Sequence, residues 1–200
     1  VLARLSRKAA ASAARPPLRA CAALSMSGVD AMAKTPSMPQ LVIVTPALRD
    51  ANNGNWQTAR RWQRLLRDRY YVRLVRQWPM SLACSDCAMI ALHARRSAES
   101  IAHWARAYPG RRLAVVLTGT DLYRDIGSDE SAQNSLRLAQ KLVVLQEIFG
   151  VNRHIRNVCD GFAARGYAVI APAVFDRYSR DFESGYSPAE VEEARKFIPR

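Results

Sequence analysis

The sequence predicts an α/β fold, namely a doubly wound, mostly parallel, Rossmann-like sheet with helices on both faces, behind a disordered N-terminal leader. The main observation is that short, mostly apolar runs alternate with segments of helical periodicity from residue 41 onward. The first and last runs stop at prolines, Pro46 and Pro172, as buried parallel strands commonly do. Hydrophobic residues make up 49% of the 200 residues, which is enough for a buried core.

The leader, residues 1–37, is rich in Ala, Ser, Arg and Pro and carries six basic residues against one acid. An Arg- and Ser-rich, acid-poor start is typical of an organellar transit peptide. The alternative is a disordered extension from an upstream start site, and we favour it because composition alone is a weak signal. In both interpretations the leader lies outside the fold.

The first half of the folded part contains four predicted strands and two predicted helices. The strands are residues 41–44, 71–75, 88–92 and 113–117. The first helix begins near Trp56, since Trp56, Ala59 and Trp62 recur at helical spacing. Ser97 is the expected N-cap of the second helix, which runs to Tyr108.

The alternation continues to the end of the chain. A helix over 131–140 leads to a strand at 142–145, and another strand is expected at 167–170. Between these strands an apolar helical face is followed by Gly166, where a left-handed C-cap belongs. The last helix starts at Ser187, since Ser187-Pro-Ala-Glu190 has the pattern of a capping box.

The formal net charge of +13 suggests a nucleic-acid binder until the charge is located. Residues 38–146 carry sixteen basic and eight acidic residues, whereas residues 147–200 carry eight of each. The excess therefore belongs to the leader and to the first part of the fold, and we expect neither a nucleic-acid nor a membrane partner. The sequence has no apolar run long enough to cross a membrane, and its four cysteines fit a reducing cytoplasm.

Residues 40–147 resemble the selenosugar synthase family of selenoneine biosynthesis, glycosyltransferases with the two-domain GT-B fold. The matching stretches are VTPA at 44–47, ANNGNWQTARRW at 51–62, IALHARRS at 90–97 and VLTGTDLYRD at 116–125. The resemblance implies transfer of a sugar from a UDP-sugar to selenophosphate, with no required cofactor or metal. It covers only the N-terminal half of such an enzyme, so we expect transferase activity to be incomplete.

The same resemblance implies a site where the strands end. Catalytic roles fall on His93 and Asp121, in orientation or proton transfer. Substrate-binding roles fall on Asn53, Gly54, Asn55, Arg95, Arg96, Thr118, Gly119 and Arg124. The structural alternatives are a polar turn with a positive-φ glycine at Gly54, a core histidine at His93 and a helix N-cap at Asp121.

Residues 143–200 resemble a second family, the dienelactone hydrolases. The matching stretches are VLQEIFGVNRHIR at 144–156, GYAVIAPAVFD at 166–176 and GYSP at 185–188. The resemblance implies that Glu147 matches a glutamate beside the family's cysteine nucleophile, with the catalytic triad itself expected beyond Arg200. Cys159 is expected in the core, because it lies on an apolar helical face.

We therefore expect a leader at 1–37, a GT-B N-terminal domain at 38–146 and a hydrolase-like fragment at 147–200. Two alternatives to the transferase stay open: a dienelactone hydrolase family protein that lacks its triad, and a non-catalytic fusion or gene-prediction product. Incomplete sheet edges favour self-association. The Cys84-Ser-Asp-Cys87 pattern has no second pair at zinc spacing, so no metal site is expected.

Overall fold

The computed structural model describes residues 38–51, 53–79, 85–119 and 121–197. The predicted leader lies outside the described residues. Strands β1 to β6 are Gln40–Val44, Tyr71–Val75, Asp86–Leu92, Arg112–Leu117, Lys141–Val144 and Ala168–Ile170. Helices α1 to α5 are Gly54–Leu66, Ala98–Ala107, Glu130–Leu138, Arg153–Ala164 and Pro188–Arg195. A π-helical turn, Asp121–Asp125, follows β4, and a 3₁₀ turn, Val174–Arg177, follows β6.

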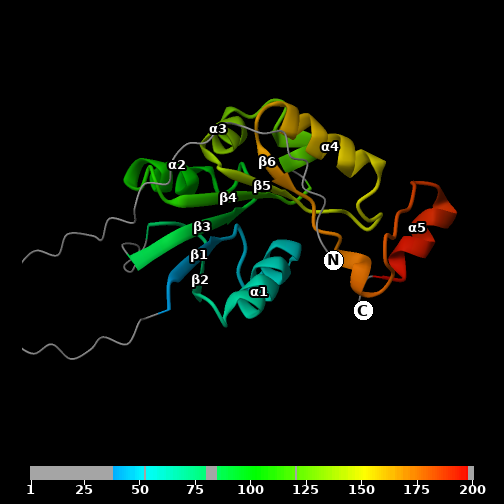
Figure 1. The fold of residues 1–200 in the computed structure, drawn as a ribbon, viewed down its shortest axis with the longest axis horizontal. Coiled ribbons are helices and arrows are strands. Elements are labelled where there is room, and N and C mark those ends of the chain that lie inside the picture. Colours follow the sequence, from blue (N-terminus) through cyan, green and yellow to red (C-terminus); the bar gives the residue numbers. More distant parts are fainter. Residues whose placement is uncertain (1–37, 52, 80–84, 120, 198–200) are drawn as a thin grey trace, which may run out of the picture.

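The six strands form one sheet in the order β2-β1-β3-β4-β5-β6, and every neighbouring pair is parallel. The connection from β1 to β2 runs to one side, whereas β3 to β6 extend to the other side (Figure 1). This change of direction between β1 and β3 defines a doubly wound sheet. The predicted fold class is confirmed.

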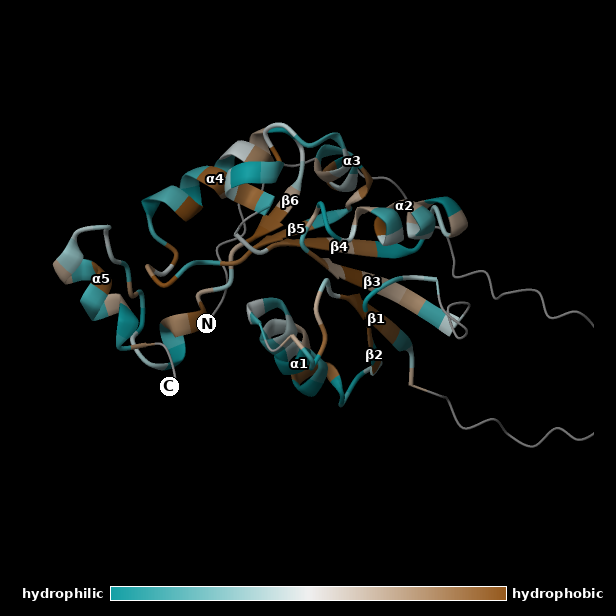
Figure 2. Cartoon of the chain, turned by 180° about the vertical axis from the view of Figure 1, so that it is seen from behind, coloured by the Kyte–Doolittle hydropathy of each residue, from teal (hydrophilic) through white to brown (hydrophobic). Residues whose placement is uncertain are grey.

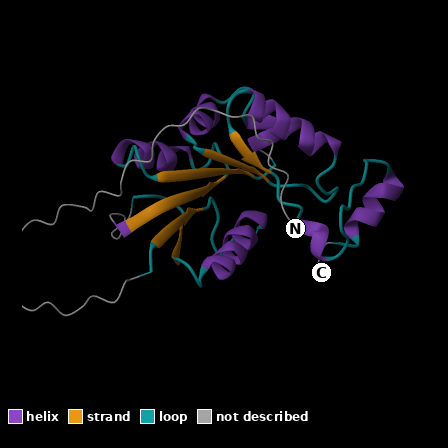
Figure 3. Ribbon diagram, in the orientation of Figure 1, coloured by secondary structure: helices purple, strands orange, loops and turns teal. Residues whose placement is uncertain are grey.

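Helices cover both faces of the sheet, as predicted. Helix α1 lies alone on one face beneath β1 and β2, and α2, α3 and α4 follow one another across the opposite face (Figures 1 and 3). The strands are the most hydrophobic part of the ribbon, while the outer sides of the helices are hydrophilic (Figure 2). The burial pattern is that of a parallel sheet, whose strands face apolar neighbours on both sides.

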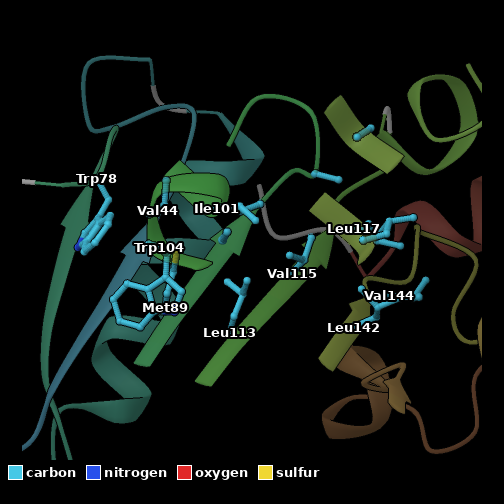
Figure 4. Packing of buried hydrophobic residues seen from close by; sticks show 14 of the residues in the cluster. Val44, Trp78, Met89, Ile101, Trp104, Leu113, Val115, Leu117, Leu142 and Val144 are labelled. Carbon is cyan, nitrogen blue, oxygen red and sulfur yellow. The ribbon is translucent and has the colours of Figure 1, made fainter. Parts of the chain in front are cut away.

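The larger core cluster lies between the sheet and helices α2 to α4 (Figure 4). At its β2 end, Trp78 and Trp104 meet edge-to-face with ring centroids 5.1 Å apart, and Tyr108 packs edge-on against both. A smaller cluster under α1 contains Leu41 and Ile43 from β1. The larger cluster also contains Ile155 and Phe162 of α4, so this core continues across the boundary predicted near residue 147.

Two helix starts differ from the sequence prediction. Ser97 stands at the N-cap position of α2, but its hydroxyl donates to the carbonyl of Leu92 at 2.7 Å rather than capping the helix. Helix α3 begins at Glu130 because the Asp129 side chain accepts from the Ala132 N–H at 2.8 Å. In both places a hydrogen bond from or to a side chain determines how the helix begins, and the hydrophobic periodicity of the sequence does not predict such a bond.

Strand β3 begins two residues before the apolar run that predicted it, at Asp86. Asp86 is fully buried because Arg73 forms an ion pair with it and the indole N–H of Trp78 donates to it at 3.1 Å. A buried carboxylate is tolerated when it is paired and hydrogen-bonded in this way.

Two turn predictions in the last third are confirmed. Gly166 has φ 90° directly after α4, the left-handed conformation that a C′ glycine adopts readily. Ser187 and Glu190 form a reciprocal capping box at the start of α5, with Pro188 at the first helical position. Cys159 is half-buried on the core side of α4, as expected.

Candidate functional site

The predicted site residues after β3 and β4 gather at the carboxyl edge of the sheet. Because all strands are parallel, the loops after β3, β4 and β5 meet at this edge. The loop after β3 begins with His93, the loop after β4 begins with Thr118 and Gly119, and the loop after β5 contains Glu147. The edge is therefore where loops from both predicted segments come together.

Asp121 ties two of these loops together. One carboxylate oxygen accepts from the Ala94 N–H at 2.8 Å, and the other accepts from the N–H groups of Thr118 and Leu122 at 2.8 and 3.1 Å. The residue is fully buried. A buried carboxylate with three backbone donors is held rigidly, so Asp121 positions the loop after β3 against the loop after β4.

His93 is buried in a strained backbone conformation. Its φ is 72°, in the left-handed region that few non-glycine residues occupy, and its exposed fraction is 1%. The ring Nδ1 lies 3.9 Å from an oxygen of Asp121, and Nε2 lies 3.9 Å from an oxygen of Asp125. Burial, together with the charges of Arg96 and Arg95, lowers the pKa of His93 despite the two carboxylates, so the ring is neutral at pH 7.

The predicted phosphate-binding arginines lie around the same cluster. Arg95 Nε is 3.0 Å from a carboxylate oxygen of Asp125, and Arg124 Nε is 3.3 Å from the other oxygen. Arg96 is exposed, and its backbone N–H approaches His93 Nδ1 at 3.4 Å. The structure thus joins His93, Asp121, Arg95 and Arg124 in one charged cluster, and their predicted chemical roles stay predictions.

Asn53, Gly54 and Asn55 form the start of α1. The Asn53 side chain caps the helix by accepting from the Trp56 N–H at 3.2 Å. Gly54 is the first residue of the helix and does not have a positive φ, so the structural alternative of a positive-φ turn glycine is wrong. A Cβ at Gly54 would meet open space, and no steric reason for glycine exists at this position.

Glu147 belongs to a second cluster that sequence reasoning did not assemble. Tyr123, on the π-helical turn after β4, lies close enough to Glu147 for the charge of that carboxylate to act on its hydroxyl. His154, on the first turn of α4, stacks on Tyr123 with ring centroids 5.5 Å apart. Burial first, and then the charge of Glu147, raise the pKa of Tyr123 to about 12. Tyr123 is thus a protonated donor at neutral pH.

The signal for this cluster was present but incomplete. Tyr123 lies two residues after Asp121, within the matching stretch 116–125, and no pattern in the sequence marks it as a site residue. Tyr123 and Glu147 lie on the loops after β4 and β5. These loops come together only because β4 and β5 are neighbours in the sheet. Arg156 and Glu183 form an exposed ion pair nearby, which holds the segment before α5 against α4.

The described cysteines carry no reactive feature. Burial raises the pKa of the Cys159 thiol, so it stays protonated on the core side of α4. Cys87 is exposed at the amino end of β3, opposite the edge that carries Glu147. Its partner in the CxxC pattern, Cys84, lies outside the described residues. Within the described residues no group of three or more potential metal ligands occurs.

In the part of the chain that the structure describes, no helix is long and apolar enough to span a membrane. The longest helix, α1, has 13 residues and carries charged side chains along its length.

The comparisons with known proteins identify one segment. Residues 131–197, from α3 to just past α5, match the dienelactone hydrolase family. A Synechocystis protein named "Putative carboxymethylenebutenolidase" is 51% identical over 55 residues, which are 28% of this chain and 22% of that protein. Proteins of the same name are 54% identical over 39 residues in Azospirillum brasilense (20% of this chain, 17% of that protein) and 50% identical over 36 residues in Escherichia coli (18% and 13%). The chain thus spans less than a quarter of the length of these relatives.

These matches confirm the hydrolase resemblance and correct another expectation. The predicted partners, a UDP-sugar and selenophosphate, are wrong, because the family and the relatives found for this chain are hydrolases. The selenosugar synthase resemblance of residues 40–147 gains no support from the comparisons. The matched segment also begins before the expected boundary at residue 147 and includes α3 and β5.

Proposed function

We propose that this chain carries part of a lactone-hydrolase site of the dienelactone hydrolase family, and that its described residues bind the substrate without completing the catalytic set. The observation that carries the proposal is the position of Glu147, within the matched segment and at the carboxyl edge of the sheet. Ligands of doubly wound sheets bind at this edge.

The groups around Glu147 suit binding rather than turnover. The pKa of Tyr123 is raised to about 12, so its hydroxyl keeps its proton at neutral pH and acts as a hydrogen-bond donor, not as a base. Ester hydrolysis by this family's chemistry needs an activated cysteine. Cys159 is protonated in the core and Cys87 lies at the opposite edge, so neither described cysteine supplies that nucleophile here.

A carboxymethylenebutenolide, the lactone in the relatives' name, is the substrate class to test. We expect titration of the ¹⁵N-labelled chain with this lactone to shift the backbone resonances of Tyr123 and of residues 146–148. Glu147→Gln should weaken binding at least about threefold, corresponding to a lost hydrogen bond. Glu130→Gln, which removes an exposed charge on α3, is the matched control and should leave binding unchanged. Shifts confined to other residues would refute the assignment.

A specific observation favours the alternative of a non-catalytic fusion. The family match covers only residues 131–197, whereas β1 to β4 of the same sheet come before the matched segment. Sequencing of full-length transcripts across residues 140–155 tests it. A transcript that encodes this junction supports a real protein, and its absence supports a gene-prediction product.

A further inference from the structure

Among the described residues, β2 is an edge strand of the sheet, with no strand paired on its outer side. The Tyr71 N–H donates to the Pro39 carbonyl at 3.0 Å, and the Val75 carbonyl accepts from the Thr45 N–H at 2.9 Å, so these two residues pair toward β1. In a parallel strand alternate residues direct their N–H and C=O groups to opposite sides. The backbone groups of Val72 and Leu74 therefore point outward, away from β1.

A groove follows this edge. Its larger part, about 970 Å³, is lined by residues of β2, by Leu48 and Gln63, and by Gln77 and Pro79 of the returning chain. A second hollow of about 320 Å³ shares Gln63, Tyr71 and Val72 with it and continues along α1. Gln63 Nε2 donates to the Val72 carbonyl at 2.9 Å, which leaves the Val72 N–H and both Leu74 groups to pair with an added strand.

Arginines line the groove, and three of the four form ion pairs with nearby acidic residues. Four arginines line its two parts, Arg64, Arg67, Arg73 and Arg76, and no acidic side chain lines it among the described residues. Arg73 is neutralised by buried Asp86, whereas the pairs of Arg76 with Asp50 and of Arg67 with Asp68 are largely exposed. Exposed pairs are weak and exchange readily with a competing carboxylate.

Charge decides between the occupants of this edge. The leader at residues 1–37 has six basic residues and one acid, so it is repelled. A second copy pairing through β2 would bring the same arginines face to face. A nucleic acid matches the charge but lacks the alternating N–H and C=O groups that Val72 and Leu74 offer.

We propose that the β2 edge binds an extended acidic peptide segment of a partner protein, which adds a strand to the sheet. Its backbone pairs with Val72 and Leu74, its carboxylates meet the arginines, and its apolar side chains lie against Leu48 and Pro79. This inference is independent of the hydrolase proposal, because the groove lies at the edge opposite β6 and away from Glu147.

The test uses the full chain and a fluorescein-labelled peptide of four Glu-Val repeats, followed by fluorescence anisotropy. Arg64→Gln combined with Arg67→Gln should weaken binding about threefold to tenfold, as expected for two exposed charge pairs. Arg106→Gln combined with Arg137→Gln removes the same charge from exposed positions on α2 and α3 and should change affinity less than about twofold. Equal weakening in both variants would overturn the proposal.

Two probes separate strand addition from charge attraction. The same peptide N-methylated at alternate residues keeps its carboxylates but loses backbone donors, and it should bind at least about tenfold more weakly. A Lys-Val repeat should not bind. Equal binding of the N-methylated peptide, or displacement of the peptide by a lower concentration of an eight-residue oligothymidylate, would show a non-specific anion or nucleic-acid surface and refute the proposal.

Discussion

The carboxylate of Asp121 accepts a hydrogen bond from the backbone N–H of Ala94 at 2.8 Å, which joins the loop after β3 to the loop after β4. The other carboxylate oxygen holds the N–H groups of Thr118 and Leu122. This one side chain therefore organises the carboxyl edge of the sheet, whichever ligand binds there. Its buried position makes it a strong determinant of stability.

Replacing Asp121 should destabilise the protein. Asp121→Ala leaves three backbone donors without their acceptor and should lower the free energy of unfolding by about 2–4 kcal/mol. Asp121→Asn keeps one acceptor oxygen and should cost about half as much. Urea unfolding followed by circular dichroism measures both variants. A loss below about 0.5 kcal/mol for Asp121→Ala would mean that the loop contact is not structural.

His93 should make the stability depend on pH. Burial lowers its folded pKa below the unfolded value of 6.5, so the native ring resists protonation. As the pH falls below about 6.5 the unfolded chain takes up a proton that the native state refuses, and stability is lost. This loss stops once the pH falls below the folded pKa.

His93→Asn tests this assignment, because asparagine tolerates the left-handed φ of 72° and does not titrate. The decrease in the urea midpoint between pH 7 and pH 5 should be smaller in the variant than in the wild type. An identical decrease in both proteins would show that His93 does not contribute to the pH dependence.

Alanine substitutions at Gly150 and Gly161, two glycines of the segment that matches the hydrolase family, should have opposite effects on stability. Gly150 has φ 75°, and a Cβ there would lie 2.0 Å from the Phe182 carbonyl oxygen. Gly150→Ala should therefore destabilise the protein by more than about 2 kcal/mol. Gly161 lies within α4 with open space around it, so Gly161→Ala should stabilise by about 0.5–1 kcal/mol. Thermal unfolding compares the two variants, and the same sign of change in both would contradict this packing.

Tyr123 should titrate unusually late. Its pKa of about 12 predicts that the ¹³Cζ resonance of Tyr123 does not move below pH 11, where an ordinary tyrosine is mostly ionised. Glu147→Gln removes a nearby negative charge and should lower this pKa, while burial keeps it above 10. Titration of Tyr123 near pH 10 in the wild type would mean that its hydroxyl is neither shielded from water nor close to Glu147 in solution.

The fold could be predicted because its strands contain short runs of mostly apolar residues. The apolar run at 41–44 is typical of a strand buried inside a parallel sheet. The observed strand β1 begins one residue earlier, at Gln40, and ends at the predicted residue. The start of β3 could not be predicted, because Asp86 becomes a strand residue only through Arg73 and Trp78, which are distant in sequence.

The candidate site was predictable only in part. His93 follows an apolar run directly and Asp121 lies four residues after the end of another, so their place at the carboxyl edge follows from strand direction. The bond from Asp121 to Ala94 and the contact of Tyr123 with Glu147 depend on which strands are neighbours. Strand order does not follow from the hydrophobic pattern, and the sequence therefore left these contacts open.

The hydrolase assignment is tested most directly by measuring turnover of a carboxymethylenebutenolide by the purified 200-residue chain, with the loss of lactone absorbance as the readout. The account predicts binding without hydrolysis above the buffer rate, because neither described cysteine, Cys87 or Cys159, is an activated nucleophile at the Glu147 edge. Turnover that persists in the purified chain and is lost in Glu147→Gln would contradict it, since the catalytic set would then be complete.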